Sequence, residues 1–159
     1  MQYLGGAMPD TLNQLICFNF YKGWREITSL YKDVYGNDIT PQNVYLLELC
    51  DLDNGITIKQ LSKGMGLDSS AVSTLVARME KKGLIKRVHG VEDRRTVFVQ
   101  LSQEGASLKQ KINEKADVLT KALNSNITLE ESTALQGIVM KLKLNREPLE
   151  RSQVREFNA

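Results

Sequence analysis

Apolar residues recur at steps of three and four positions along much of the chain, and this spacing predicts amphipathic helices. Residues 10–35 form the longest such segment and predict one long helix. Its apolar face consists of Leu12, Leu15, Ile16, Phe20, Trp24, Ile27, Leu30 and Val34. A second helix is predicted to start at Thr40-Pro41, because threonine caps a helix and proline fits its first turn. The inner side of that helix carries Val44, Leu47 and Cys50.

Two shorter helices are predicted next, separated by a turn. Thr57 and Gln60 have the spacing of a capping box, and the helix that they open is closed by glycine. The helix after the turn is capped by Asp68 or Ser69 and runs to about Lys82. Its buried face is expected to consist of Val72, Leu75, Val76 and Met79. A short helix, a turn and a second helix together indicate a helix-turn-helix.

The pattern then changes to the alternation that is typical of strands. Residues 84–88 and 96–101 predict two short strands, and the second is rich in β-branched and aromatic residues. The polar residues 89–95 between them predict a hairpin with a charged tip. Two short strands directly after a helix pair indicate a wing.

Two further helices are predicted, one from Ser102 to about Asn124 and one opened by a capping box of Thr128 and Glu131. The first has an apolar spacing close to that of a coiled-coil seam. The helices at the two ends of the chain carry more apolar surface than one small domain can bury. Such a surplus is typical of a two-fold interface, so we expect a homodimer.

These elements predict a mainly α fold with a small β wing, in the α+β class. We expect a winged helix-turn-helix domain over residues 40–101. The terminal helices, residues 10–36 and 102–145, are expected to form a dimerisation domain. Residues 1–9 and 146–159 are expected to be flexible termini.

The composition is that of a folded, soluble chain, since 42% of its 159 residues are hydrophobic and 25% are charged. No apolar run approaches the roughly 20 residues that cross a bilayer, and no secretory signal is visible, so we expect a cytoplasmic protein without a membrane partner. Cys17 and Cys50 lie far apart and fit no zinc motif, and His89 is the one histidine. We therefore expect neither a metal site nor a cofactor.

The net charge of +2 conceals a basic centre. Between Thr57 and Arg95 nine basic residues stand against four acidic ones, whereas the rest of the chain has twelve basic and fifteen acidic residues. A basic centre within an acidic frame indicates a surface that faces a polyanion, such as duplex DNA. A solvated charged face is the simpler alternative.

The second helix of the helix-turn-helix presents polar side chains opposite its apolar face. The outward residues are predicted to be Ser69, Ser70, Ser73, Thr74 and Arg78. Small hydroxyl side chains let a helix lie deep in the major groove and bind base edges or phosphates, and Arg78 can reach a phosphate or a guanine edge. The alternative is that the serines only cap the helix and fill its surface.

The wing offers a second group of cations. Arg94 and Arg95 lie at its tip, and arginine suits the narrow and strongly negative minor groove. The adjacent Asp93 can hold a guanidinium in one geometry. Lys86 and Arg87 at the base of the wing are predicted to contact phosphates.

At this point the sequence resembles a known family, the MarR (multiple antibiotic resistance) regulators. The resemblance is carried by Leu84 to Arg87, by Asp93-Arg94-Arg95 and by the run from Val97 to Gly105. It implies a dimeric winged-helix protein on palindromic DNA, usually a repressor released by a ligand or by oxidation. It also implies that Arg95 enters the minor groove with Asp93 as its orienting partner, and that Ser69 to Arg78 read the major groove.

The first predicted helix resembles that of the one-cysteine, hydroperoxide-sensing (OhrR-like) branch of this family, through Leu12 to Phe18 and the tyrosines beyond. That resemblance implies that Cys17 is the redox sensor and that Tyr31 is its partner, reached across the dimer. The branch has a second tyrosine before the helix-starting proline, where this chain has Thr40, so Tyr35 or Tyr45 would have to replace it. The alternative is that Cys17 is a small apolar core residue.

Three other functions remain open. A small aromatic or amphipathic inducer would bind near Phe20, Trp24 and Tyr45. A thiol peroxidase using Cys17 is disfavoured, because His89 lies in the wing and leaves no Cys–His dyad, so we expect no enzyme. A structural dimer would bind DNA without sequence preference.

Overall fold

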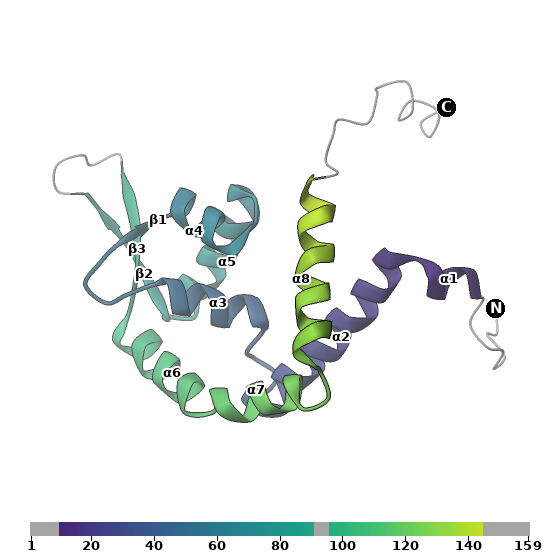
Figure 1. Cartoon of the computed structure of the whole chain (residues 1–159). Helices are drawn as coiled ribbons and strands as arrows, with labels where there is room; N and C mark the ends of the chain where they lie inside the picture. Colours follow the sequence, from purple (N-terminus) through teal and green to yellow (C-terminus); the bar gives the residue numbers. More distant parts are fainter. Residues whose placement is uncertain (1–9, 91–95, 145–159) are drawn as a thin grey trace, which may run out of the picture. The chain divides into compact units, whose positions relative to one another are not determined.

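The structure is a computed structural model that describes residues 10–90 and 96–144. The chain divides into two compact units, Met1–Ala122 and Leu123–Ala159. The described elements follow the order α1-α2-α3-β1-α4-α5-β2-β3-α6-α7-α8 (Figure 1). The fold is thus mainly helical with one small sheet, as the sequence predicts.

The first predicted helix is divided in two, so the prediction of one helix over residues 10–35 is wrong at Leu15. The two pieces are α1 (Asp10–Gln14) and α2 (Ile16–Tyr35). Leu15 has an extended backbone, with φ −75° and ψ 118°, and the Asn19 side chain donates to the carbonyl of Asn13 across the break at 2.8 Å. Apolar spacing continues through a single extended residue, so the pattern does not reveal the break.

The three helices of the predicted helix-turn-helix region begin at side-chain caps. They are α3 (Pro41–Leu49), α4 (Ile58–Met65) and α5 (Ser69–Lys81). Thr40 and Asn43 cap each other reciprocally, and so do Thr57 and Gln60. Asp68, rather than Ser69, caps α5 by accepting from the Ala71 N–H at 2.8 Å. These caps satisfy amide groups that the first helical turn leaves without partners.

Two glycines end the helices of this region in left-handed conformations. Gly66 follows α4 with φ +64°, and Gly83 follows α5 with φ +73°. Side chains disfavour this conformation, so glycine is the residue that lets the chain turn sharply after each helix.

The wing strands belong to a three-stranded antiparallel sheet in the order β1-β3-β2. The strands are β1 (Ile56–Thr57), β2 (Ile85–His89) and β3 (Val97–Leu101). Ile56 pairs with Val99, and Ile85 pairs with Leu101. The sequence analysis did not predict β1, because two residues are too few to show an alternating pattern.

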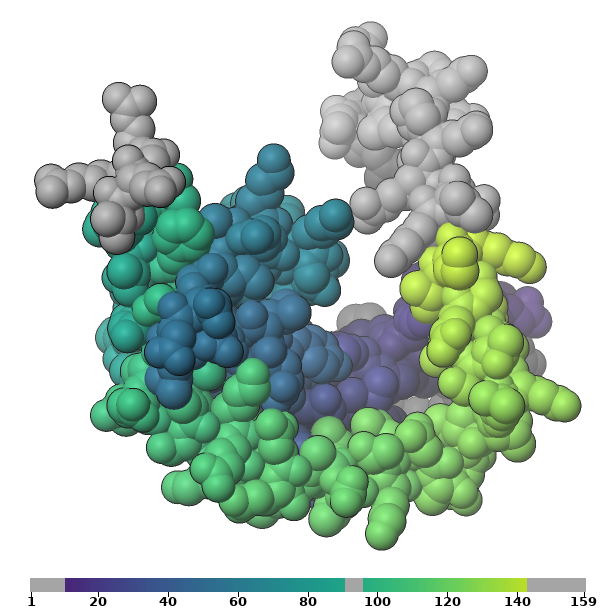
Figure 2. Space-filling model, turned by 60° about the vertical axis from the view of Figure 1, so that its left-hand side comes forward, coloured from purple at the N-terminus to yellow at the C-terminus, as the bar shows by residue number. Residues whose placement is uncertain are grey.

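The core of the first unit lies where α3, α4 and α5 meet the sheet. Its fully buried side chains come from all four parts: Leu46, Leu47, Cys50, Leu61, Val72, Val76, Met79 and Val99. The predicted inner face of α5 is confirmed, since Val72, Leu75, Val76 and Met79 are all buried. Figure 2 shows these helices and the strands as one lobe, with α6 along its lower side.

Helix α6 (Gln103–Glu114) is held against the turn that follows α5. The Ser102 hydroxyl donates to the carbonyl of Gly83 at 2.6 Å, and the Ser102 amide donates to that of Leu84 at 3.1 Å. Gly105 lies against this turn, and a Cβ on Gly105 would fall 1.9 Å from the Leu84 oxygen. The base of the wing and α6 are therefore packed backbone to backbone.

The predicted helix over residues 102–124 is interrupted at Lys115, where α6 ends and α7 (Ala116–Asn124) begins. The Lys115 ammonium donates to the carbonyl of Val34 at 3.2 Å, near the end of α2. Lys109 likewise donates to the carbonyls of Glu48 and Cys50 at the end of α3, at 3.0 and 3.2 Å. Cations are favourable at helix C-termini, so these two lysines join the α6–α7 segment to α2 and α3.

The second unit contains α8 (Leu129–Leu144), which Thr128 and Glu131 open as the predicted capping box. Its apolar side chains are largely exposed in the single chain: Leu129, Leu135, Ile138, Val139, Met140 and Leu142.

Across residues 10–90 and 96–144, no helix combines the length and apolar character that spanning a bilayer requires. The same residues hold no group of three histidine, cysteine or acidic side chains placed to bind a metal ion.

Candidate nucleic-acid interface

The outward face of α5 carries the residues that the sequence predicts for base reading. Ser69, Ser70, Thr74 and Arg78 are exposed, and Ser73 is partly buried. The opposite face of the helix is buried in the core, so the direction of the outward face is fixed by packing. The structure thus places all five residues on one exposed helix.

The hydroxyl groups of α5 donate to acceptors on their own helix. Ser73 donates to the Ser69 carbonyl at 2.7 Å, and Thr74 donates to the Ser70 carbonyl at 3.0 Å. Ser70 donates to the Asp68 carboxylate at 2.7 Å. Since the hydroxyl protons are used in these hydrogen bonds, the oxygens keep lone pairs that can accept from the amino groups of adenine or cytosine.

Asp68 combines two of these contacts. Hydrogen bonds from the Ala71 amide and from the Ser70 hydroxyl favour its charged form and lower the pKa of its carboxyl group. A charged Asp68 at the start of α5 is favourable in the field of the helix, and it orients Ser70.

Sequence reasoning missed Lys81 on the same outward face. Ser70, Thr74, Ala77 and Lys81 follow one another at steps of four, three and four, so they form one stripe opposite the core. Lys81 and Ala77 are both exposed. The helical period alone was sufficient to include Lys81.

The two cations at the base of the wing have different surroundings. Arg87 shares a strand face with the buried Ile85, and its guanidinium forms an ion pair with Glu80 of α5 at 2.9 Å. Lys86 points to the other face, beside Gln100 of β3, and is exposed. Of the two predicted phosphate contacts, Lys86 is therefore the one without an ion-pair partner among the described residues.

The predicted minor-groove residues Asp93, Arg94 and Arg95 lie outside the described residues. The described ends of the two wing strands are held together, because the Gly90 amide donates to the Thr96 carbonyl at 2.9 Å.

The predicted sensor residues lie at opposite ends of α2. Cys17 is exposed, whereas Tyr31 is only 6% exposed. Fourteen residues of helix separate them by roughly 21 Å, so they do not meet within one chain. Contact between them requires a second copy of the chain.

Tyr31 belongs to a cluster of tyrosines where α2 meets α3. Its ring centroid lies 5.7 Å from that of Tyr35. Burial raises the pKa of Tyr31 well above its ordinary value, and a hydrogen bond with Tyr45 raises it further. Tyr45 thus lies beside Tyr31, although Thr40 occupies the position where the hydroperoxide-sensing branch has a tyrosine.

Cys50 lies in the core, as the sequence predicts, with 2% of its surface exposed. Burial raises the pKa of its thiol to about 11, against the smaller opposing effect of the Lys109 charge. A neutral and inaccessible thiol is inert, so Cys17 is the accessible thiol of the two.

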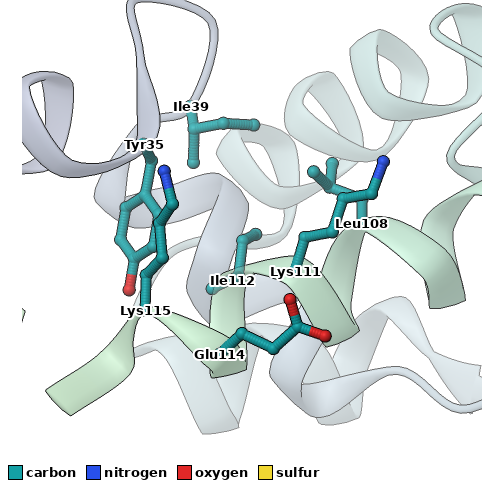
Figure 3. A pocket seen from close by; sticks show the side chains of 7 residues that line it. All are labelled: Tyr35, Ile39, Leu108, Lys111, Ile112, Glu114 and Lys115. Atoms are coloured by element: carbon teal, nitrogen blue, oxygen red, sulfur yellow. The ribbon is translucent and has the colours of Figure 1, made fainter. Parts of the chain in front are cut away.

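The residues predicted to line a ligand site, Phe20, Trp24 and Tyr45, are exposed by 37%, 40% and 42%. A cavity of about 260 Å³ lies elsewhere, between the end of α2, the segment before α3 and α6 (Figure 3). Apolar and charged side chains both line it, and the lining consists of Tyr35, Ile39, Leu108, Lys111, Ile112, Glu114 and Lys115. None of the three predicted residues lines this cavity.

Comparison with known proteins agrees with this geometry. The sequence model of the MarR family matches residues 39–97. The organic hydroperoxide resistance transcriptional regulator of Bacillus subtilis is 36% identical over 102 residues, which are 63% of this chain and 69% of the relative.

Two solved structures share the fold. The PcaV transcriptional regulator of Streptomyces coelicolor, in complex with its natural ligand, superposes with a TM-score of 0.74 at 15% identity, over 90% of this chain and 100% of that one. The MepR–DNA complex of Staphylococcus aureus gives a TM-score of 0.67 at 21% identity, over 80% and 96%. With its winged helix-turn-helix and this 36% identical relative, the chain belongs to the MarR family and is a DNA-binding transcriptional regulator.

Proposed function

We propose that the protein is a repressor that binds a palindromic operator as a homodimer and is released when Cys17 is oxidised. The observation that carries the DNA-binding part is the outward face of α5, where hydroxyl oxygens and Lys81 stand opposite a fully buried helix face. Such a helix enters the major groove with its N-terminal residues toward base edges. Arg94 and Arg95 at the wing tip, with Asp93 orienting Arg95, are assigned to the minor groove, and Lys86 to phosphates.

Exposed apolar side chains support the dimer. On α2 and just before it, Leu15, Ile16, Phe20, Tyr21 and Trp24 are each at least 37% exposed in the single chain. Helix α8 independently exposes a further set of apolar side chains. A second copy of the chain that covered these faces would bury apolar area and align two α5 helices with two half-sites.

The exposure of Cys17 supports the redox part. A sensor thiol must be accessible to peroxide, and Cys17 is, whereas Cys50 is not. The similarity to the Bacillus subtilis organic hydroperoxide resistance regulator points to an organic hydroperoxide as oxidant. The thiolate attacks the peroxide oxygen, the O–O bond breaks, and the products are an alcohol and a cysteine sulfenic acid, which a thiol reduces again.

The test is binding of the reduced protein to its own upstream DNA, before and after one equivalent of cumene hydroperoxide. We expect tight binding that is lost on oxidation and restored by dithiothreitol. Cys17→Ser should bind DNA and stay bound after peroxide, and Cys50→Ala is the matched control that should still be released. Release of Cys17→Ser equal to wild type would refute the sensor role.

Arg95→Ala tests the wing assignment separately. We expect it to lose most of the DNA affinity while gel filtration still gives a dimer, since no dimer contact is assigned to the wing. Wild-type DNA affinity in this variant would show that Arg95 does not contact DNA.

A second candidate is release by a small aromatic acid, which the cavity beside α6 favours. Its apolar residues Ile39, Leu108 and Ile112 suit a ring, and Lys111 and Lys115 suit a carboxylate (Figure 3). This candidate would be established if peroxide did not change DNA binding but benzoate-type ligands weakened it. Leu108→Trp, which fills the cavity, should then bind DNA normally in the presence of the ligand.

We propose no catalytic role for Cys17. The exposed thiol lies on α2, whereas His89 lies at the end of β2 in the wing. Peroxide consumed in excess of protein, with dithiothreitol present, would overturn this.

A further inference from the structure

A polar hollow of about 220 Å³ lies on one flank of α5, between its C-terminal half and the segment that enters α3. Two cations line it, Arg78 and Lys82, which are four residues apart and therefore stack on the same side of the helix. The remaining lining residues are Asn37, Asp38, Thr40, Asn43 and Met79.

Two of the uncharged polar residues of the hollow, Thr40 and Asn43, already have hydrogen-bond partners. Asn43 Oδ1 accepts from the amide and the hydroxyl of Thr40, at 3.0 and 2.9 Å. Asn43 Nδ2 donates to the sulfur of Met79 at 3.2 Å. Thr40 and Asn43 therefore form part of the wall of the hollow, and its remaining donors are those of the two cations and of the Asn37 side chain.

The side chains of the two cations make almost no hydrogen bonds or ion pairs with the described residues. Arg78 is exposed, and its side chain has no hydrogen bond or ion pair with any described residue. Lys82 makes one long hydrogen bond, 3.5 Å from its ammonium to the carbonyl oxygen of Asp38. The Asp38 carboxylate is the acidic group of the hollow, so its side chains carry a net positive charge.

The opposite flank of α5 differs in charge. There Glu80 neutralises Arg87 through an ion pair, and Ser62 donates to Ser69 at 3.3 Å. The free positive charge of α5 is thus found on the stripe that ends in Lys81 and on the Arg78–Lys82 flank. A helix lying in the major groove has a phosphate strand along each flank, so this flank is the one suited to bind backbone phosphates.

We propose that Arg78 and Lys82 form a phosphate clamp that holds the DNA backbone at one wall of the major groove, so that Arg78 does not read a guanine edge. This inference rests on the proposed binding of α5 to the major groove. The position of the hollow favours phosphate because Arg78 lies on the flank of α5, beside the stripe formed by Ser70, Thr74 and Lys81, rather than on it. A guanidinium and an ammonium together can bind the anionic oxygens of a phosphodiester.

If Arg78 and Lys82 form this clamp, removing them should lower the affinity for DNA to the same extent whatever the DNA sequence. Full-length Arg78→Gln, Lys82→Gln and the double variant would be titrated onto the upstream DNA and onto a scrambled duplex of equal length, by fluorescence anisotropy at roughly 50 to 200 mM salt. We expect the double variant to weaken binding to both duplexes by the same factor. The slope of log K against log salt is negative, and it should become shallower by about 0.9 for each cation removed, in each protomer.

Two further variants make the test sharper. Asp38→Asn removes the acidic group of the hollow and should tighten binding to both duplexes and steepen the salt slope. Lys121→Gln removes an exposed cation of α7 and should change neither quantity. Circular dichroism and gel filtration would show that each variant keeps the wild-type fold and oligomeric state.

The outcomes separate this inference from the function on which it rests. Wild-type protein that bound neither duplex would refute the proposed function. Wild-type binding with an unchanged salt slope in the double variant would refute the clamp alone. A loss confined to the upstream DNA would also refute it, because Arg78 would then be reading a base. A last outcome would assign the hollow to a free anion instead. Inorganic phosphate at matched ionic strength would then raise the Tm of wild type but not of the double variant, and the salt slope of DNA binding would be the same in both proteins.

Discussion

The carboxylate of Glu80 lies 2.9 Å from the guanidinium of Arg87, and this ion pair joins the last part of α5 to the first wing strand. Both side chains are 37% exposed, so the pair contributes little to stability. Its larger effect is on charge, because Glu80 neutralises a cation that would otherwise face the phosphates. The pair also holds the wing strand in one position relative to α5.

Glu80→Gln should therefore increase the affinity for DNA. The substitution frees Arg87 to bind phosphate and removes a carboxylate that repels DNA, so the slope of log K against log salt should steepen by about 0.9 per protomer. Anisotropy titrations at several salt concentrations measure both quantities. Weaker binding would show that the orientation of the wing matters more than the free charge, and Glu130→Gln, in α8, is the matched control.

Gly105→Ala should destabilise the fold, because the new methyl group would lie 1.9 Å from the Leu84 carbonyl oxygen. The obstacle is backbone, so the base of the wing has to move away from α6. Overpacking of this kind costs about 1 to 3 kcal/mol or more. Urea unfolding followed by circular dichroism measures the loss. Gly23→Ala is the control, since a Cβ there meets nothing within 4 Å and alanine is the better helix former; equal stabilities for the two variants would contradict the close packing.

Lys109→Met should destabilise the junction of α6 with α3. The methionine keeps the apolar stem but removes the donor to the carbonyls of Glu48 and Cys50. Because Lys109 is only 25% exposed, we expect a loss of about 1 to 2 kcal/mol in the free energy of unfolding. Lys111→Met, two residues on, replaces an exposed lysine and should leave that free energy unchanged. A Lys109→Met variant as stable as wild type would show that water caps α3 equally well.

The two thiols should differ sharply in reactivity. Cys17 is exposed, whereas Cys50 is 2% exposed and burial raises the pKa of its thiol to about 11. An aromatic disulfide reagent at neutral pH should therefore modify one thiol per native chain and both in urea. Cys17→Ser should react only after unfolding. Rapid modification of native Cys17→Ser would contradict the burial of Cys50.

The same shift predicts a pH dependence of stability. As pH rises from about 9 to 11, the Cys50 thiol of the unfolded chain loses its proton while that of the folded chain keeps it. The unfolded state then binds fewer protons, so stability falls with pH, by up to about 2.7 kcal/mol from this group. Urea unfolding near pH 8 and pH 10.5 should show a smaller fall for Cys50→Ala than for wild type. Tyr31, whose pKa is also raised, contributes to the fall in both proteins.

Local spacing was sufficient to predict most elements. The capping boxes at Thr57 and Thr128 are confirmed, because a cap depends on residues three positions apart. Spacing failed where one residue interrupts a helix, at Leu15 and Lys115, and where a strand has two residues, at Ile56 and Thr57. The break at Lys115 and the pairing of β1 involve contacts with distant parts of the chain, which a local pattern does not contain. The break at Leu15 has local hydrogen bonds, but a single extended residue leaves the apolar spacing unchanged.

The sequence by itself determined the order of helices and wing strands, the outward face of α5 and the resemblance to the MarR family. It also identified the basic centre, but not which of its cations are available. Only the tertiary structure decided that Arg87 is paired with Glu80, that Lys109 caps α3, and that Arg78 and Lys82 share an open hollow. The physical reason is that ion pairing and capping depend on distances of a few ångströms between side chains from different elements, and these distances exist only after the elements have packed.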